Sequence, residues 1–207
     1  MDGKQAFAAL PQEKQDRILN AAMEVFAQNE YKRASTADIA AKAGVAKGLL
    51  FYYFKNKQEL YLYCYDYAVS LLRGAMTSRR LRETDDFFEL MNIGAQIKLD
   101  QMEKMPWLAG FSVRAFSSRG ESISPSIQQR VQQDLEDAGS YFAHVDFSRF
   151  REGVDPGYLL RMLTWMTEGY LDEKLRAGEG IHAESMMEDY RRWEQMLRRI
   201  AYKEEYQ

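Results

Sequence analysis

Apolar residues recur every three to four positions along most of this chain, which is the spacing of an amphipathic helix. The strict alternation of apolar and polar residues that marks a strand between turn signals is not found. Proline-containing start signals at Pro11, Ser124-Pro125 and Asp155-Pro156 divide the pattern into segments. The pattern therefore predicts an all-α fold of about nine helices.

These nine helices are expected at residues 11–29, 36–43, 47–54, 56 into the 70s, 85–104, 106–120, 125–141, 156–175 and 183–204. The first carries an inner stripe of Ile18, Leu19, Ala22, Phe26 and Met23. The fourth contains no proline and reaches Gly74 before its first glycine, so we expect one long, stiff element. Residues 143–154 are mixed in character and are expected to form an irregular loop.

Residues 35–57 have the pattern of two short helices around a tight turn. Thr36 is a candidate N-cap of the first, since a hydroxyl can accept a hydrogen bond from an unpaired backbone N–H. Gly44 comes where that helix should end, because glycine adopts the left-handed conformation at little cost. On the second helix Leu50 and Phe54 face inwards. The outward residues are Lys47, Gly48, Phe51 and Tyr52. A helix-turn-helix presents such an outward face to the DNA major groove.

This stretch resembles the DNA-binding domain of the TetR family of bacterial transcriptional regulators. The matches in register to the family pattern are Thr36, Ile39, Ala40, Ala43, Gly44, Val45, Gly48, Leu50, Phe54, Lys57 and Leu60. The resemblance is clear over residues 11–71. It implies a three-helix DNA-binding head with a helix-turn-helix, followed by a larger helical ligand-binding and dimerisation domain. The implied division is an N-terminal DNA-binding domain at 1–55 and a C-terminal effector-binding and dimerisation domain at 56–207.

The resemblance also implies roles for individual residues. Phosphate contacts are expected from Thr36, Tyr53 and Lys57, and base contacts from Lys47 and Gly48. The complete set expected at the DNA comprises Thr36, Lys47, Gly48, Leu49, Phe51, Tyr52, Tyr53 and Lys57. Ala46, Leu49 and Phe51 depart from the family pattern, so base recognition at those positions stays open; Leu49 offers only apolar contact to a thymine methyl group. For Tyr52 and Tyr53 the alternative is packing between helices.

The charge distribution supports a nucleic-acid partner. The whole chain of 207 residues has a net charge of −3, yet residues 14–57 hold eight basic and four acidic side chains. That stretch therefore carries +4 and the remainder −7. A basic region on an acidic protein can meet phosphates with one face.

Composition bounds the class of protein further. Apolar residues make up 46% of the chain, enough for a substantial core. The single cysteine, Cys64, excludes an intramolecular disulfide and suits a reducing compartment. The pattern of a signal peptide is not found at the start, and no run of 18 apolar residues predicts a membrane span. We therefore expect a cytoplasmic protein without a membrane partner.

The C-terminal part contains two candidate surfaces. Large flexible and aromatic side chains suggest an adaptable apolar effector pocket, although plain core is the alternative for any one of them. The pocket candidates are Tyr63, Tyr67, Met91, Met102, Trp107, Phe111, Met162, Trp165 and Met166. On the last helix a heptad-like seam suits a helix-bundle interface, and a dimeric bundle of the last two helices is what the resemblance implies. That seam consists of Met186, Tyr190, Trp193, Leu197 and Ile200, for which packing within one subunit is the alternative.

Catalysis finds little support. His144 and His182 are the only histidines, and neither has a metal-ligand partner at helical spacing. Neither a nucleophile-elbow nor a phosphate-cradling glycine motif occurs, so no enzyme, cofactor or metal is expected. The favoured hypothesis is a homodimeric repressor that reads a near-palindromic double-stranded operator and is released by a small apolar or amphipathic effector. The rival hypothesis is a helical ligand-binding or scaffolding protein that no longer reads DNA. Effector, operator, regulated genes and the choice between repression and activation are left open.

Overall fold

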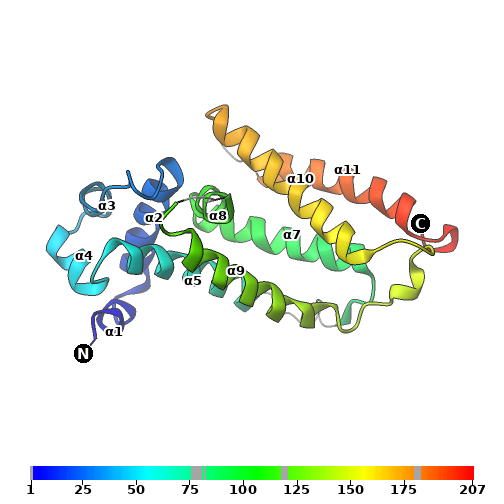
Figure 1. Cartoon of the computed structure of the whole chain (residues 1–207), viewed down its shortest axis with the longest axis horizontal. Coiled ribbons are helices and arrows are strands. Elements are labelled where there is room, and N and C mark those ends of the chain that lie inside the picture. Colours follow the sequence, from blue (N-terminus) through cyan, green and yellow to red (C-terminus); the bar gives the residue numbers. More distant parts are fainter. Residues whose placement is uncertain (1, 76–80, 82, 118–120, 180–182) are drawn as a thin grey trace. The chain divides into compact units, whose positions relative to one another are not determined.

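The computed structural model describes residues 2–75, 81, 83–117, 121–179 and 183–207. Within these residues the chain forms ten α-helices and three short 3-10 helices, and the one β-type pairing is an isolated bridge between Phe150 and Tyr202 (Figure 1). The prediction of an all-α fold is confirmed. The α-helices are α1 Gly3–Ala8, α2 Gln12–Gln28, α3 Thr36–Ala43, α4 Lys47–Tyr53, α5 Lys57–Ala75, α7 Phe87–Lys104, α8 Leu108–Ser117, α9 Ser124–Ala138, α10 Pro156–Arg176 and α11 Ala183–Ala201.

The chain forms two compact units. Unit 1 comprises Met1–Leu71 and Lys104–Asp134, and unit 2 comprises Leu72–Glu103 and Leu135–Gln207. Unit 1 therefore contains the predicted helix-turn-helix together with α8 and most of α9, which come much later in the sequence. The division of the chain into functions at 1–55 and 56–207 remains a prediction.

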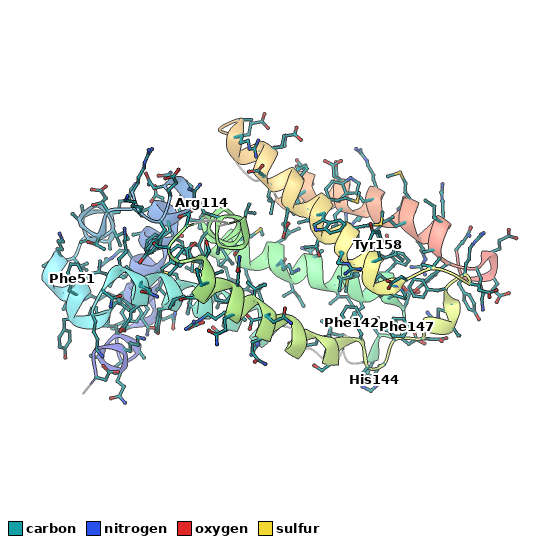
Figure 2. All side chains as sticks on the ribbon, in the orientation of Figure 1. Phe51, Arg114, Phe142, His144, Phe147 and Tyr158 are labelled. Atoms are coloured by element: carbon teal, nitrogen blue, oxygen red, sulfur yellow. The ribbon has the colours of Figure 1, made fainter. Side chains whose placement is uncertain are left out.

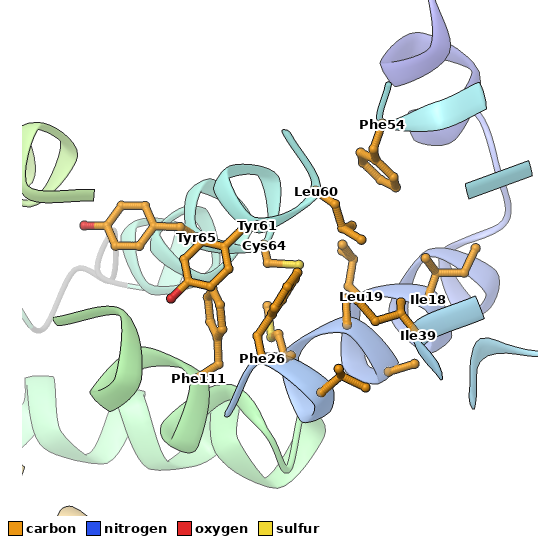
Figure 3. Packing of buried hydrophobic residues seen from close by; sticks show 14 of the residues in the cluster. Ile18, Leu19, Phe26, Ile39, Phe54, Leu60, Tyr61, Cys64, Tyr65 and Phe111 are labelled. Atoms are coloured by element: carbon orange, nitrogen blue, oxygen red, sulfur yellow. The ribbon is translucent and has the colours of Figure 1, made fainter. Parts of the chain in front are cut away.

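The core of unit 1 is a continuous apolar cluster built on α2. The predicted inner stripe of this helix is buried, as Ile18, Leu19 and Phe26 illustrate in Figure 3. Phe26 meets Tyr61 of α5 at 4.7 Å between ring centroids, and Tyr61 meets Phe111 of α8 at 5.0 Å. Such edge-to-face pairs add to the stabilisation from buried area alone. The helices that carry the predicted DNA-binding residues thus share one core with α8.

Helix α1 was not predicted from the sequence. It packs against α4 so closely that a Cβ atom on Gly3 would lie 2.0 Å from the backbone oxygen of Tyr52. Its Phe7 is fully buried, with ring centroids 4.7 Å from Phe54 and 5.5 Å from Tyr53. α1 therefore supports the carboxyl end of the second helix of the helix-turn-helix.

Unit 2 is built on α7, α10 and α11. A polar network around Asp86 joins the start of α7 to Arg149 and to α11. The Asp86 carboxylate caps α7 by accepting the N–H of Glu89 at 2.9 Å, close to the helix start expected at residue 85. It also accepts two bonds from Arg198 of α11, at 2.7 and 3.1 Å, and one from Arg149 at 3.1 Å. Desolvation raises the pKa of Asp86, but the Glu89 N–H and the two guanidinium groups outweigh it and hold that pKa below its usual value.

The predicted helix starts lie within one or two residues of those observed: α2 begins at Gln12 with Pro11 as its cap, α8 at Leu108 and α9 at Ser124. The end expected at residue 141 was placed too late, since α9 ends at Ala138. Asp155 caps α10 through bonds from the N–H groups of Gly157 and Tyr158, at 2.8 and 3.2 Å, and Pro156 is the first helical residue. Beyond its end Gly178 has a φ of 70°. The predicted end of the sixth helix near Gly120 lies outside the described residues. The loop expected at 143–154 is irregular apart from a 3-10 turn at Phe147–Arg149.

Candidate nucleic-acid interface

The turn between α3 and α4 has the geometry that the sequence pattern predicted, with one correction. Gly44 adopts a left-handed conformation, with φ 64°, and Val45 donates its N–H to Ala40 O at 3.0 Å. The expectation that Thr36 is the N-cap is wrong. Ser35 is the cap, since its Oγ accepts the N–H groups of Ala37 and Asp38 at 3.2 and 3.3 Å. Thr36 is therefore the first residue of α3.

Helix α4 divides into the buried and exposed faces that its pattern predicted. Leu50 and Phe54 are buried in the core of unit 1. The opposite face is open: Tyr52 is 56% exposed, and Figure 2 shows Phe51 at the outer edge of this helix. Lys47 and Gly48 are exposed as well. This exposed face of α4 carries a cation and aromatic rings and is free to enter a groove.

Two residues at the start of α4 are directed to the outside. The Lys47 ammonium lies 5.8 Å from the centre of the Phe51 ring, and within the described residues no ion pair joins it to a carboxylate. A Cβ atom on Gly48 would meet nothing within 4 Å. Since a side chain would fit there, the fold itself does not require glycine. A close approach of Gly48 to DNA bases remains a prediction.

Lys57 is engaged within the protein. Its Nζ donates to three backbone oxygens, those of Tyr31 at 2.6 Å, Ala34 at 3.0 Å and Lys32 at 3.2 Å. Its ammonium also lies 4.6 Å from the centre of the Tyr31 ring, and desolvation lowers its pKa. These three bonds account for all three ammonium protons. A phosphate contact by Lys57 remains a prediction, and it would require the lysine to give up one of these carbonyls.

The other predicted DNA contacts differ in exposure. Thr36 is half-buried at the start of α3, and Leu49 is partly buried against the core. Tyr53 is only 6% exposed and packs against Phe7, so packing between helices accounts for most of its surface. Their contacts with DNA remain predictions, and for Tyr53 they rest on its hydroxyl alone.

The effector-pocket candidates belong to both units. Tyr63, Tyr67, Trp107 and Phe111 lie in unit 1, and Met91, Met102, Met162, Trp165 and Met166 lie in unit 2. Tyr67 ties α5 to α2: its hydroxyl donates to Asp16 at 2.8 Å and accepts from Gln12 at 3.1 Å. Burial and the Asp16 carboxylate raise the pKa of Tyr67 to about 12. Phe111 is fully buried, whereas Trp165 is exposed on α10.

Most residues of the predicted seam on α11 are buried within the subunit. Met186 and Tyr190 are buried, and Leu197 is 7% exposed. Trp193 is half-buried and meets Tyr170 of α10 at 5.9 Å between ring centroids. Ile200 differs, because 69% of it is exposed. For most of the seam, packing within one subunit is therefore what the single chain displays.

Three features that support the site were not identified from the sequence. Gly3 and Phe7 of α1 support α4, and Glu121, in the loop before α9, accepts the N–H of Tyr31 at 2.6 Å. The available signals for α1 were Phe7 and the capping box formed by Asp2 and Gln5. A contact across 90 residues leaves no local pattern that could have revealed Glu121.

Two further tests concern metals and membranes. Within the described residues, groups of three or more His, Cys, Asp or Glu side chains placed to hold a metal ion are not found, and His182 lies outside these residues. Among the helices the structure describes, none combines the length and apolar character needed to cross a bilayer.

Comparison with known proteins gives a consistent result. Residues 18–64 match the model of the bacterial regulatory proteins of the tetR family. The chain is 27% identical to the fatty acid metabolism regulator protein of Bacillus subtilis over 162 residues, which is 76% of this chain and 79% of that protein. It is 44% identical over 50 residues to the HTH-type transcriptional activator FasR of Mycolicibacterium smegmatis, which is 24% of this chain and 23% of that protein.

Solved structures share the fold. The fatty acid degradation regulator FadR of Bacillus halodurans superposes with a TM-score of 0.61 at 17% identity, over 89% of this chain and 95% of that one. The matched segment 18–64 contains α3, α4 and the turn at Gly44 described above. The helix-turn-helix with its open α4 face, the family match and the shared fold agree: residues 18–64 contain a helix-turn-helix of the kind found in bacterial regulatory proteins of the tetR family, and the chain as a whole shares the fold of regulators of known structure.

Proposed function

We propose that this protein is a homodimeric repressor that reads a near-palindromic operator and leaves it when a small amphipathic molecule binds. The observation that carries the DNA-reading part is the open face of α4. There Lys47, which has no carboxylate partner among the described residues, a glycine with open space around it and two exposed aromatic rings lie opposite a buried stripe. Lys47 is suited to the N7 and O6 acceptors of guanine in the major groove.

The surface for a second copy is formed by apolar residues that the single chain leaves uncovered. On α11 these are Met196, 55% exposed, and Ile200. On α10 Tyr158 and Trp165 are exposed and meet edge to face at 6.0 Å, and Figure 2 shows Tyr158 on this helix. Large exposed apolar side chains on adjacent helices favour an interface between proteins. Pairing through α10 and α11 would place two α4 helices on one operator, ideally about 34 Å or a multiple apart.

The proposed effector carries a long apolar chain and an anionic group. The relatives named as fatty acid regulators suggest this class, and α7 offers residues that suit it. Lys98 shares a helical face with Met91 and Met102, at spacings of seven and four residues. The Lys98 side chain keeps exposed surface, but desolvation by the surrounding protein lowers its pKa. A cation beside flexible apolar side chains attracts an amphipathic anion.

A gel-shift with the DNA upstream of its own gene, followed by selection from a random duplex pool, tests operator recognition. Ile200→Glu tests the dimer: an exposed residue tolerates charge in the monomer, so we expect a folded monomer by sedimentation with weakened operator binding. The matched control, Gln195→Glu, places the same charge on the same helix. A stable Ile200→Glu dimer would move the interface elsewhere.

Calorimetric titration with palmitate, a long apolar chain with one anionic group, tests the effector. Linkage requires that operator DNA weakens ligand binding by the same factor by which the ligand weakens DNA binding, typically about 5- to 150-fold. Lys98→Met should weaken binding of palmitate while leaving ligand-free operator affinity intact. Equal ligand affinities for free and operator-bound protein would contradict release by this class of molecule.

A further inference from the structure

The loop that leads into the helix-turn-helix is held by charged groups of opposite sign. This loop, residues 29–35, joins α2 to α3 within unit 1. The Glu121 carboxylate accepts the N–H of Tyr31 at 2.6 Å, and the Lys57 ammonium donates to the carbonyl of the same residue at 2.6 Å. The two peptide groups of Tyr31 are thus fixed between an anion and a cation. We name Glu121, Tyr31 and Lys57 the Tyr31 clamp.

Glu121 is itself oriented by the helices on either side of it. Its backbone N–H donates at 3.1 Å to the Oγ of Ser124, the first residue of α9. Its carboxylate lies 3.7 Å from Nη2 of Arg114, which Figure 2 shows on α8. A displacement of α8 or α9 therefore carries the carboxylate with it. Hydrogen bonds to charged groups are stronger than neutral ones, so the loop resists separation from Glu121.

Tyr31 in turn is locked to the core and to the start of α3. Its ring lies 5.4 Å from Tyr61 in an edge-to-face contact and 6.4 Å from Phe26. Ser35, the cap of α3, follows only four residues later. Because so short a segment cannot absorb much movement, the position of Tyr31 sets the position of α3 and, through the turn at Gly44, of α4.

We propose that Glu121 is a positioning residue that transmits displacements of α8 and α9 to the helix-turn-helix through the Tyr31 clamp. The two ends lie 90 residues apart in sequence but in one compact unit. This inference rests on α3 and α4 being the DNA-reading pair, and it is independent of the identity of the effector. Glu121 acts through Tyr31 and makes no contact with DNA itself.

The test is a double-mutant cycle between Glu121 and its buried neighbour Ile123. Ile123→Ala should loosen the packing next to Glu121 without changing Glu121 itself, because Ile123 is fully buried. The readout is hydrogen exchange at the Ile39 amide of α3, whose N–H donates to Ser35 O at 3.1 Å and which Glu121 does not touch. Ile123→Ala should speed that exchange about fivefold in the wild-type background and leave it unchanged in the Glu121→Ala background.

Two further variants keep the result interpretable. Glu121→Gln retains an acceptor of the same shape, so it should preserve the fold and show reduced but measurable coupling. Asp66→Asn breaks an exposed ion pair with Arg130 that joins α5 to α9 without reaching the loop, and it should leave the coupling intact. An equal effect of Ile123→Ala with and without the Glu121 carboxylate would overturn the proposal. Because the exchange readout needs neither operator nor effector, failure of the proposed function would leave this test decisive.

Discussion

Helices α4 and α11 both show a clear apolar stripe, but the two stripes differ in what they mean for function. On α4 the predicted DNA-reading residues lie opposite the stripe, and Lys47, Gly48 and Tyr52 are exposed. On α11 the predicted dimer residues are the stripe itself, and most of it is buried within the subunit. An apolar stripe predicts burial, but it does not say whether the cover is the same chain or a second copy. The face opposite the stripe is the better place to look for a partner.

Polar residues differ between the same two helices in a parallel way. Lys47 of α4 faces outwards beside the Phe51 ring, whereas Arg198 of α11 donates two hydrogen bonds to Asp86. Both residues are basic and both lie on amphipathic helices, so their type alone does not separate them. The two hydrogen bonds of Arg198 depend on the position of Asp86, which is 112 residues away in sequence.

The largest effect is expected from Leu197→Glu on α11. A charge placed at a position that is 7% exposed has no partner in the apolar layer, so unit 2 should lose about 3 kcal/mol or more of stability. Chemical denaturation of the whole protein measures this loss of unfolding free energy. Gln195→Glu on the exposed side of the same helix should cost almost nothing. A fully stable Leu197→Glu protein that merely dissociates would show that the stripe faces a second copy after all.

Asp86→Asn should come next, with a loss of about 2 to 3 kcal/mol, because it leaves two guanidinium groups without their shared anion. The pKa of Asp86 is lowered in the folded protein, so its contribution is complete above the usual value of 3.8 and is lost as the pH falls towards the folded value. The difference in unfolding free energy between wild type and variant should therefore shrink below pH 4. A constant difference down to pH 2 would argue against ionic pairing.

Lys47→Ala on α4 should act on DNA and not on the fold. Losing a base contact should reduce discrimination between operator and random duplex by about 1 to 3 kcal/mol, with unfolding unchanged. Competition binding at fixed salt concentration measures the ratio. If both affinities fall by the same factor, Lys47 contacts only phosphate. Lys55→Ala, at an exposed lysine beyond the end of α4, is the matched control for simple loss of charge.

Gly48→Ala should give the smallest and most diagnostic change. Alanine is the better helix former and would meet nothing within 4 Å, so the protein should become more stable by about 0.5 to 1 kcal/mol. Operator affinity should fall at the same time, because the added methyl group lies on the face that we propose enters the groove. Thermal unfolding and gel-shift titration measure the two quantities. A gain in stability with unchanged DNA affinity would remove Gly48 from the close approach to DNA.

Much of the helix-turn-helix could be predicted because its determinants are local. The left-handed Gly44, the buried Leu50 and Phe54 and the open face of α4 follow from spacing within about 20 residues. Even the error in the cap of α3 was a shift of one residue, from Thr36 to Ser35, since both residues have a hydroxyl able to cap. The start of α10 at Asp155-Pro156 could be predicted for the same reason, because a cap and a first-turn proline are neighbours in the chain.

The sequence by itself therefore determined the all-α class, the approximate positions where helices begin and end, and the face of α4 turned away from the core. The reason is that helical periodicity and capping depend on neighbours in the chain. Tertiary structure alone decided which charged residues became structural. Lys57, predicted to contact phosphate, holds three carbonyls of a loop some 25 residues earlier, and Glu121 reaches the same loop from 90 residues later. The physical reason is that a charge takes the nearest oppositely polarised group in space, and sequence spacing carries no information about that distance.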